Sequence, residues 1–130
     1  MKVVNTKTLK LSFQNHLLTC EILKDVEIEA VHTEENYLAT LEITGGEKFL
    51  CLVIPSPFST VSTEAQKASM TPEKYENVVA QAIIIHSLAQ RIVANFMIKF
   101  FKYPCPCRLF DGKEEAVKWL YGEWEKENRG

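Results

Sequence analysis

Apolar and polar residues alternate over residues 9–13, which is the spacing of a strand with one buried face. The turn-prone residues 14–16 separate this segment from a second apolar run at 17–23. Two short strands joined by a turn predict an N-terminal β-hairpin.

A helical period follows the hairpin. Asp25 is a suitable N-cap for a helix that begins at Val26, and Gly45 and Gly46 are typical of a helix end. Apolar residues recur near a 3.6-residue spacing at Ile28, Val31, Leu38 and Leu41. The sequence therefore predicts one long helix up to Gly45.

Strands and helices then alternate to the end of the chain. Strands are predicted at 48–54, 78–85 and 108–110, and helices at 63–70, 88–101 and from about 111 onward, with a further helical turn at Thr71 and Pro72. The prolines before 108–110 suit a strand at a sheet edge. This order predicts an α/β fold with an N-terminal β-hairpin, a mixed and mostly parallel sheet, helices packed on it, and a single domain over 1–130.

The segment 88–101 is more apolar than one helix face requires. Its apolar residues fill two adjacent i,i+4 rows, while Arg91, Asn95 and Lys99 form the opposite row. Core packing explains one such row, because a helix must cover the sheet. The alternative is an apolar surface outside the core, for a partner or a lipid-sized pocket, formed by Phe96, Met97, Ile98, Phe100 and Phe101.

Composition narrows the class of protein. A chain of 130 residues with 46% hydrophobic and 25% charged residues is typical of an ordinary globular domain. Its net charge of -2 gives no general attraction to phosphate backbones, so nucleic-acid binding is not expected.

The chain shows no signal-peptide pattern at its start, and polar residues interrupt its most apolar stretch, 78–101. No membrane span is predicted, and a cytoplasmic location is expected. Cys20 and Cys51 lie in apolar strand-like runs, where free cysteines behave as small buried hydrophobic residues.

Catalytic motifs such as the nucleophile elbow, the P-loop or the paired-histidine zinc helix do not occur. The closely spaced pair Cys105 and Cys107 is the best candidate for a metal site. Such a site needs two more ligands, for which His86 and Cys51 are the candidates. His86 follows a predicted strand without a nucleophile pattern beside it. We therefore expect no enzyme activity, no metal and no cofactor.

The C-terminal half carries a family resemblance. The segments Ser87-Leu88-Ala89, Ile92-Val93-Ala94-Asn95-Phe96, Tyr103-Pro104-Cys105-Pro106 and Arg108-Leu109-Phe110, and the run from Lys113 to Leu120, resemble SpoIIAA-like proteins, relatives of the STAS domain. These short bacterial proteins mostly have no assigned function. The resemblance implies a SpoIIAA/STAS-like fold and a non-enzymatic regulatory or protein-interaction module.

In the STAS domains that antagonise anti-sigma factors, a serine at the start of the helix after a central strand is phosphorylated. The matching loop here offers Ser59, Ser62 and Thr63 as phospho-acceptors or partner contacts. The Asp-Ser-Ser-type motif of those domains is absent, and the segment 55–58 stands in its place. This departure favours Ser62 as an ordinary helix N-cap.

Two functions follow as hypotheses. The first is a STAS-type module with a protein partner. The alternative is a carrier of a small apolar ligand, because SpoIIAA-like folds also resemble lipid-carrier domains of the SEC14 kind. A homodimer through the edge strand or the apolar helix stays open.

Overall fold

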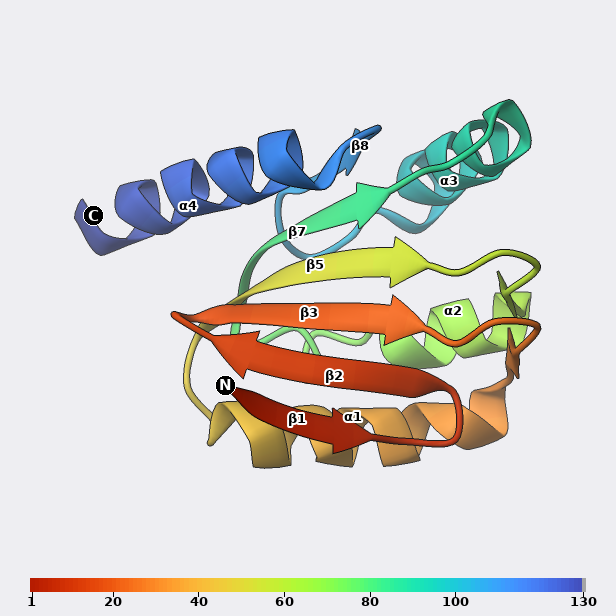
Figure 1. Ribbon diagram of the computed structural model, residues 1–130, viewed down its shortest axis with the longest axis horizontal. Coiled ribbons are helices and arrows are strands. Elements are labelled where there is room, and N and C mark those ends of the chain that lie inside the picture. Colours follow the sequence, from red (N-terminus) through yellow and green to blue (C-terminus); the bar gives the residue numbers. More distant parts are fainter. Residues whose placement is uncertain (130) are drawn as a thin grey trace.

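A six-stranded sheet forms the centre of the molecule in the computed structural model, which describes residues 1–129 (Figure 1). Its strands are β1 (Lys2–Asn5), β2 (Leu9–Gln14), β3 (Leu17–Ile22), β5 (Phe49–Pro55), β7 (Val78–Ile84) and β8 (Cys107–Phe110). They lie side by side in the order of the chain. The short strands β4 (Glu27–Ile28) and β6 (Thr60–Val61) form a separate parallel pair.

The predicted sheet type is confirmed. The pairs β1–β2 and β2–β3 are antiparallel, and the three pairs from β3 to β8 are parallel. Asn15 and His16 join β2 to β3 with φ values of 52° and 66°, as a tight two-residue hairpin turn requires. The N-terminal hairpin is therefore present, and β8 lies at the sheet edge as its flanking prolines predicted.

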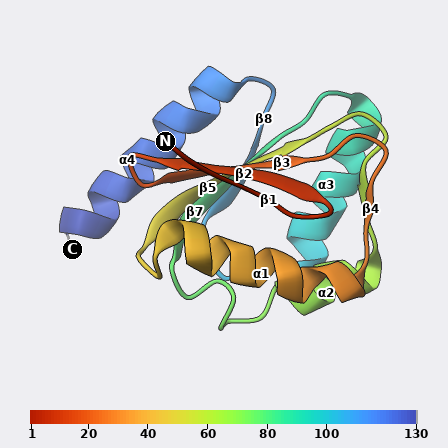
Figure 2. The ribbon, with the colours of Figure 1, turned by 60° about the horizontal axis from the view of Figure 1, so that its bottom comes forward.

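Four helices surround the sheet: α1 (Ala30–Thr44), α2 (Thr63–Ser69), α3 (Leu88–Phe101) and α4 (Lys113–Arg129). In Figure 2, α1 and α2 cover one face of the sheet and α4 lies against the other. Both views place α3 toward the end of the sheet where β3, β5 and β7 finish. The alternation of strands and helices thus gives the predicted α/β fold.

The two faces of the sheet have separate cores. Leu11 and Leu18 of the hairpin pack with Ile43 of α1 on one face. On the other face, Leu52 of β5 packs with Leu120 of α4. Because α3 contributes no buried residue to either core, its apolar surface is not used to hold the sheet.

The predicted start of the first helix is wrong. Asp25 has a φ of 59° and is not an N-cap, and α1 begins at Ala30. The reason is that Glu27 and Ile28 form β4 and pair with β6, which keeps their backbone extended. The end of this helix is predicted correctly, since Gly45 has the left-handed conformation at its C-cap.

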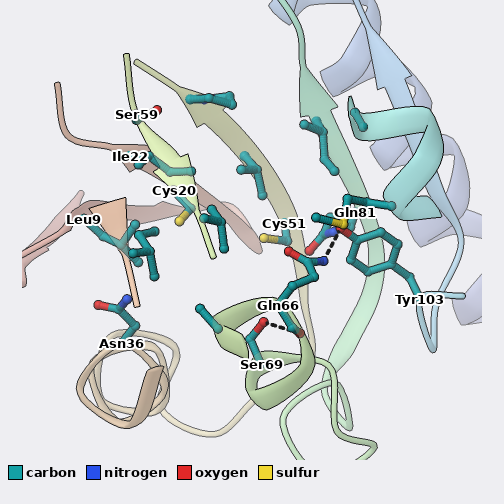
Figure 3. A pocket seen from close by; sticks show the side chains of 18 of the residues that line it. Leu9, Cys20, Ile22, Asn36, Cys51, Ser59, Gln66, Ser69, Gln81 and Tyr103 are labelled. Atoms are coloured by element: carbon teal, nitrogen blue, oxygen red, sulfur yellow. Dashed lines mark hydrogen bonds between the residues drawn. The ribbon is translucent and has the colours of Figure 1, made fainter. Parts of the chain in front are cut away.

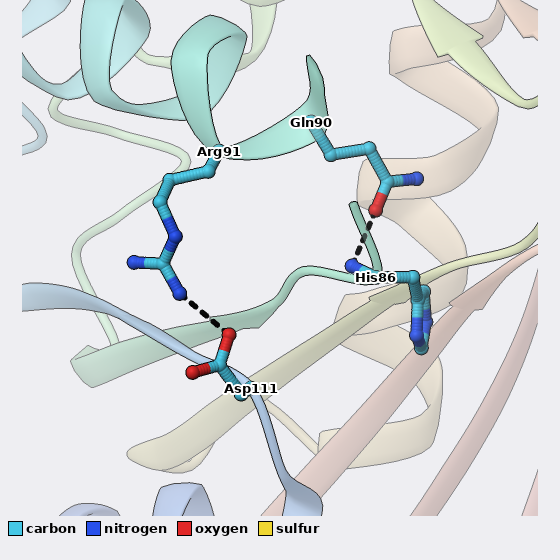
Figure 4. Close-up of polar contacts among 4 residues, drawn as sticks. All are labelled: His86, Gln90, Arg91 and Asp111. Atoms are coloured by element: carbon cyan, nitrogen blue, oxygen red, sulfur yellow. Dashed lines mark hydrogen bonds and ion pairs between the residues drawn. The ribbon is translucent and has the colours of Figure 1, made fainter. Parts of the chain in front are cut away.

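Three further differences concern short segments. β1 was not predicted, because four residues at an exposed sheet edge carry little apolar signal. Residues 72–77 form turns rather than the helical turn predicted at Pro72. Asp111 pairs with Arg91 of α3, and α4 begins two residues later at Lys113 (Figure 4).

Candidate functional site

A cavity of about 610 Å³ lies between the sheet and the helices α1, α2 and α3. The sheet contributes side chains from β2, β3, β5 and β7, and the helices contribute the opposite wall. Figure 3 shows its lining, with Cys20 and Ile22 toward one end and Gln81 and Tyr103 toward the other. The volume is that of a small-molecule site rather than a packing defect.

Most of the cavity wall is apolar. Its apolar side chains come from the sheet and from the inner side of α3, and include Leu18, Ile22, Val53, Ile83, Val93 and Met97. A surface of this kind favours the hydrocarbon part of a ligand, because its burial removes apolar area from water.

Neutral polar groups gather at one end. The hydroxyl of Tyr75 donates to Gln81 Oε1 at 3.1 Å, and Gln66 Nε2 donates to the hydroxyl of Tyr103 at 2.7 Å. Gln81 Nε2 also lies 3.6 Å from Cys107 Sγ. Both glutamines are buried, so their amides are held in place by these partners.

Burial keeps the thiols of the cavity and the phenol of Tyr103 in their neutral forms. It raises the pKa of Cys20 from 9.0 to about 12 and holds the pKa of Cys51 well above 9.0. The pKa of Tyr103 rises from 10.0 to about 12, mainly through burial, with a smaller opposing effect from the Gln66 hydrogen bond. These thiols and this phenol are therefore protonated near pH 7, and the thiols are weak nucleophiles.

Lys74 is the charged side chain in the cavity wall as described over residues 1–129. Its Nζ donates to the carbonyl of Ala68 at 2.8 Å and lies 5.8 Å from the ring centroid of Tyr37. The ammonium is thus already engaged with a carbonyl and an aromatic face.

The residues predicted for the apolar surface do not share one environment. Met97 lines the cavity, while Phe96 and Phe100 are exposed and stack on each other with ring centroids 4.3 Å apart. Ile98 and Phe101 are half-buried. The helix α3 therefore has an inner side toward the cavity and an outer side toward solvent.

Of the three predicted phospho-acceptors, Ser59 lines the same cavity, and Ser62 and Thr63 do not. The hydroxyl of Ser59 donates to the carbonyl of Ser56 at 2.7 Å. The hydroxyl of Ser62 accepts from the backbone of Ala65 at 3.1 Å, which makes it the N-cap of α2. Thr63 is exposed, and phosphorylation of the three residues stays a prediction.

The other candidate residues do not line the cavity, although Cys107 contacts Gln81, which does. His86 is exposed, and its backbone N–H donates to Gln90 Oε1 at 2.6 Å (Figure 4). Cys105 and Cys107 are free and half-buried. Within residues 1–129 no three His, Cys, Asp or Glu side chains are grouped so as to hold a metal ion.

The comparison with protein families gives one match. Residues 11–122 match the model of DUF7793, described as a domain of unknown function. The chain belongs to the DUF7793 family. No curated protein matches it.

The fold of this DUF7793 chain is also found in a solved structure. An uncharacterised protein of the DUF3478 family from Shewanella loihica PV-4, described as having a SpoIIAA-like fold, is 14% identical with a TM-score of 0.62. The match covers 86% of this chain and 91% of that one. At this identity the likeness shows the fold, and it confirms the SpoIIAA-like fold predicted from the sequence.

The neutral polar cluster of the DUF7793 chain was not predicted. Its members, Gln66, Tyr75, Gln81 and Tyr103, come from four separate segments. One signal was available, since Gln81 is a lone polar residue within the apolar strand run 78–85. A buried amide in such a strand needs a partner inside the fold.

For this chain, no helix within residues 1–129 is both long and apolar enough to cross a bilayer.

Proposed function

We propose that this DUF7793 chain binds a small amphiphile, with an apolar body and an uncharged polar head, in the cavity between the sheet and α1–α3. The observation that carries the proposal is the 610 Å³ space with a largely apolar wall. Sites for small ligands commonly have this size and composition.

The polar end of the cavity specifies the head group. Gln66 uses Nε2 to reach Tyr103, which leaves its carbonyl oxygen as an acceptor. Tyr103 accepts that bond, which leaves its hydroxyl proton as a donor. A hydroxyl or amide head group satisfies both, whereas a carboxylate has no proton to give to Gln66.

The sequence favours a STAS-type module with a protein partner first and a carrier of a small apolar ligand second. This proposal puts ligand binding first. The Asp-Ser-Ser-type motif of the STAS phospho-switch is absent, and residues 55–58 stand in its place, which weakens the phospho-switch hypothesis. Over residues 1–129 the cavity wall offers thiols of raised pKa and no carboxylate, which supports binding rather than catalysis. A protein-interaction module stays a prediction, and the exposed outer side of α3 is the feature that supports it.

The test is a titration with N-phenyl-1-naphthylamine, an uncharged apolar dye whose fluorescence rises in apolar sites. Ala94 lies on α3 and lines the cavity, so Ala94→Trp fills part of the space. We expect at least about tenfold weaker dye binding, because an indole occupies volume that the dye needs. Asn95→Trp is the matched control, since Asn95 is exposed on the same helix and is not part of the wall.

Competition then tests the head group. A long-chain alcohol should displace the dye at lower concentration than the carboxylic acid of equal chain length. Equal dye binding by Ala94→Trp and Asn95→Trp would contradict the cavity as the site. Stronger competition by the acid would assign the head group to Lys74 instead.

A further inference from the structure

We propose that the outer side of α3 docks on an anionic lipid bilayer, with the helix lying along the membrane surface. This inference goes beyond ligand binding in the cavity and does not depend on it. It rests on the exposed apolar row of α3 and on the sign of the charges around that row.

The apolar row is formed by side chains at i,i+4 spacing. Leu88, Ile92, Phe96 and Phe100 are 73%, 62%, 53% and 65% exposed. Residues four apart lie on one face of a helix, so these side chains form a continuous strip. We name this strip the outer row of α3. A contiguous apolar strip on a soluble domain marks an interaction surface.

The charged side chains near the outer row are basic apart from Asp111, which pairs with Arg91. Between Glu76 and Asp111 every charged side chain is basic, namely Arg91, Lys99, Lys102 and Arg108, although the whole chain has a net charge of -2. Lys99 and Lys102 are exposed near the C-terminal end of the row, beside Phe96 and Phe100. Lysines beside apolar side chains complement a surface that is both apolar and negatively charged, as an anionic bilayer is.

The dimensions favour a surface position. The 14 residues of α3 give a length of about 21 Å, shorter than the roughly 30 Å hydrocarbon core of a bilayer. An amphipathic helix of this length binds parallel to the membrane, with its apolar side chains below the head groups. The inner side of α3, including the half-buried Ala94 and Met97, would still face the cavity.

The helix α1 provides an internal contrast. Val31 and Leu38 are 78% and 55% exposed on α1, so this helix also presents large apolar side chains to solvent. Its charged residues are Glu34, Glu35 and Glu42, with no lysine or arginine. An anionic membrane would repel this surface, so exposure alone does not predict the same behaviour for the two helices.

The experiment is co-sedimentation of the full chain with vesicles of phosphatidylcholine containing about one third phosphatidylglycerol. We expect Phe96→Ser/Phe100→Ser to weaken binding at least about tenfold, because it removes two apolar anchors from the outer row. Val31→Ser/Leu38→Ser on α1 should bind like the unchanged chain. Both double variants replace exposed side chains, and circular dichroism checks that each is folded.

Charge is tested separately. Lys99→Gln and Lys102→Gln should each weaken binding about fivefold, and pure phosphatidylcholine vesicles or about 0.5 M salt should weaken it further.

The proposal is overturned if the unchanged chain does not sediment with anionic vesicles, or if neutral and anionic vesicles bind equally. It is also overturned if the α1 and α3 double variants behave alike. A concentration-dependent dimer that Phe96→Ser/Phe100→Ser abolishes would assign the outer row to a second copy of the chain. The dye titration of the cavity is a separate measurement, so either proposal can fail alone.

Discussion

The helices α3 and α4 are neighbours in the chain, and they relate to the sheet in opposite ways. α3 is mostly apolar, since its polar residues are only Gln90, Arg91, Asn95 and Lys99. It nevertheless buries no residue. α4 is far more polar, yet Ala116 and Leu120 are fully buried against β5 and β7. Two well-placed small or branched side chains therefore anchor α4 where a mostly apolar α3 has no such contact.

The difference shows that apolar content and core packing are separate properties of a helix. A helix packs on a sheet when its apolar side chains meet the strand surface at close range. α3 instead borders a cavity on one side and solvent on the other. Its apolar residues are then available for molecules other than this chain.

The largest expected effect is on the free energy of unfolding, which a truncation in α4 should lower far more than one in α3. Leu120→Ala should lower the free energy of unfolding by about 2–5 kcal/mol, because it leaves a cavity in a closed core. Ile92→Ala, an equivalent truncation on the outer row of α3, should change it by less than about 0.5 kcal/mol. Urea unfolding of both variants measures the contrast. A loss of similar size in both would show that α3 is part of the core.

Alkaline pH probes the cavity side of the sheet. Burial raises the pKa of Cys20 to about 12 and that of Cys107 to about 11, against 9.0 for an ordinary thiol. Above pH 9 the unfolded chain releases thiol protons that the folded protein keeps. The stability due to these groups is therefore complete below pH 9 and is lost as the pH rises toward 12.

Urea unfolding between pH 8 and pH 11 follows this loss. The variant Cys20→Val should show a shallower decline, by about one proton, because valine does not ionise. An unchanged slope would mean that Cys20 is open to solvent in the folded protein.

The smallest expected effect concerns the polar link between the two helices. Arg91 of α3 pairs with Asp111, just before α4, and the aspartate is well exposed. Asp111→Asn should cost about 0.2–1 kcal/mol at low salt, and the difference should shrink as salt is added. A larger, salt-independent cost would show that this pair holds α3 in place.

Much of the fold could be predicted from the sequence because local patterns matched the final environment. The hairpin, the strand runs and the caps Gly45 and Ser62 depend on nearby residues. The errors arose where distant partners decide. Glu27 and Ile28 are extended because they pair with β6. The local pattern of residues 25–30 does not indicate this pairing, so it predicted a helix there.

The candidate site was only partly predictable. The surplus of apolar residues on α3 indicated a surface outside the core, but the sequence could not divide Met97, toward the cavity, from Phe96 and Phe100, toward solvent. The cavity itself depends on the distance between helices and sheet. Such distances follow from tertiary packing, so Gln66 and Tyr103 were not identified as partners.

The six strands of the main sheet lie in space in the order in which they are synthesised. Each strand leaving the ribosome can therefore add beside the one before it, without waiting for a later strand to be inserted. The contacts between α4 and the first hairpin form differently: the hydroxyl of Tyr121 donates to the carbonyl of Asn15, 106 residues earlier, at 2.7 Å, and Trp124 stacks on His16. Closing so long a loop costs entropy, so we expect these contacts between the two ends of the chain to form late in folding.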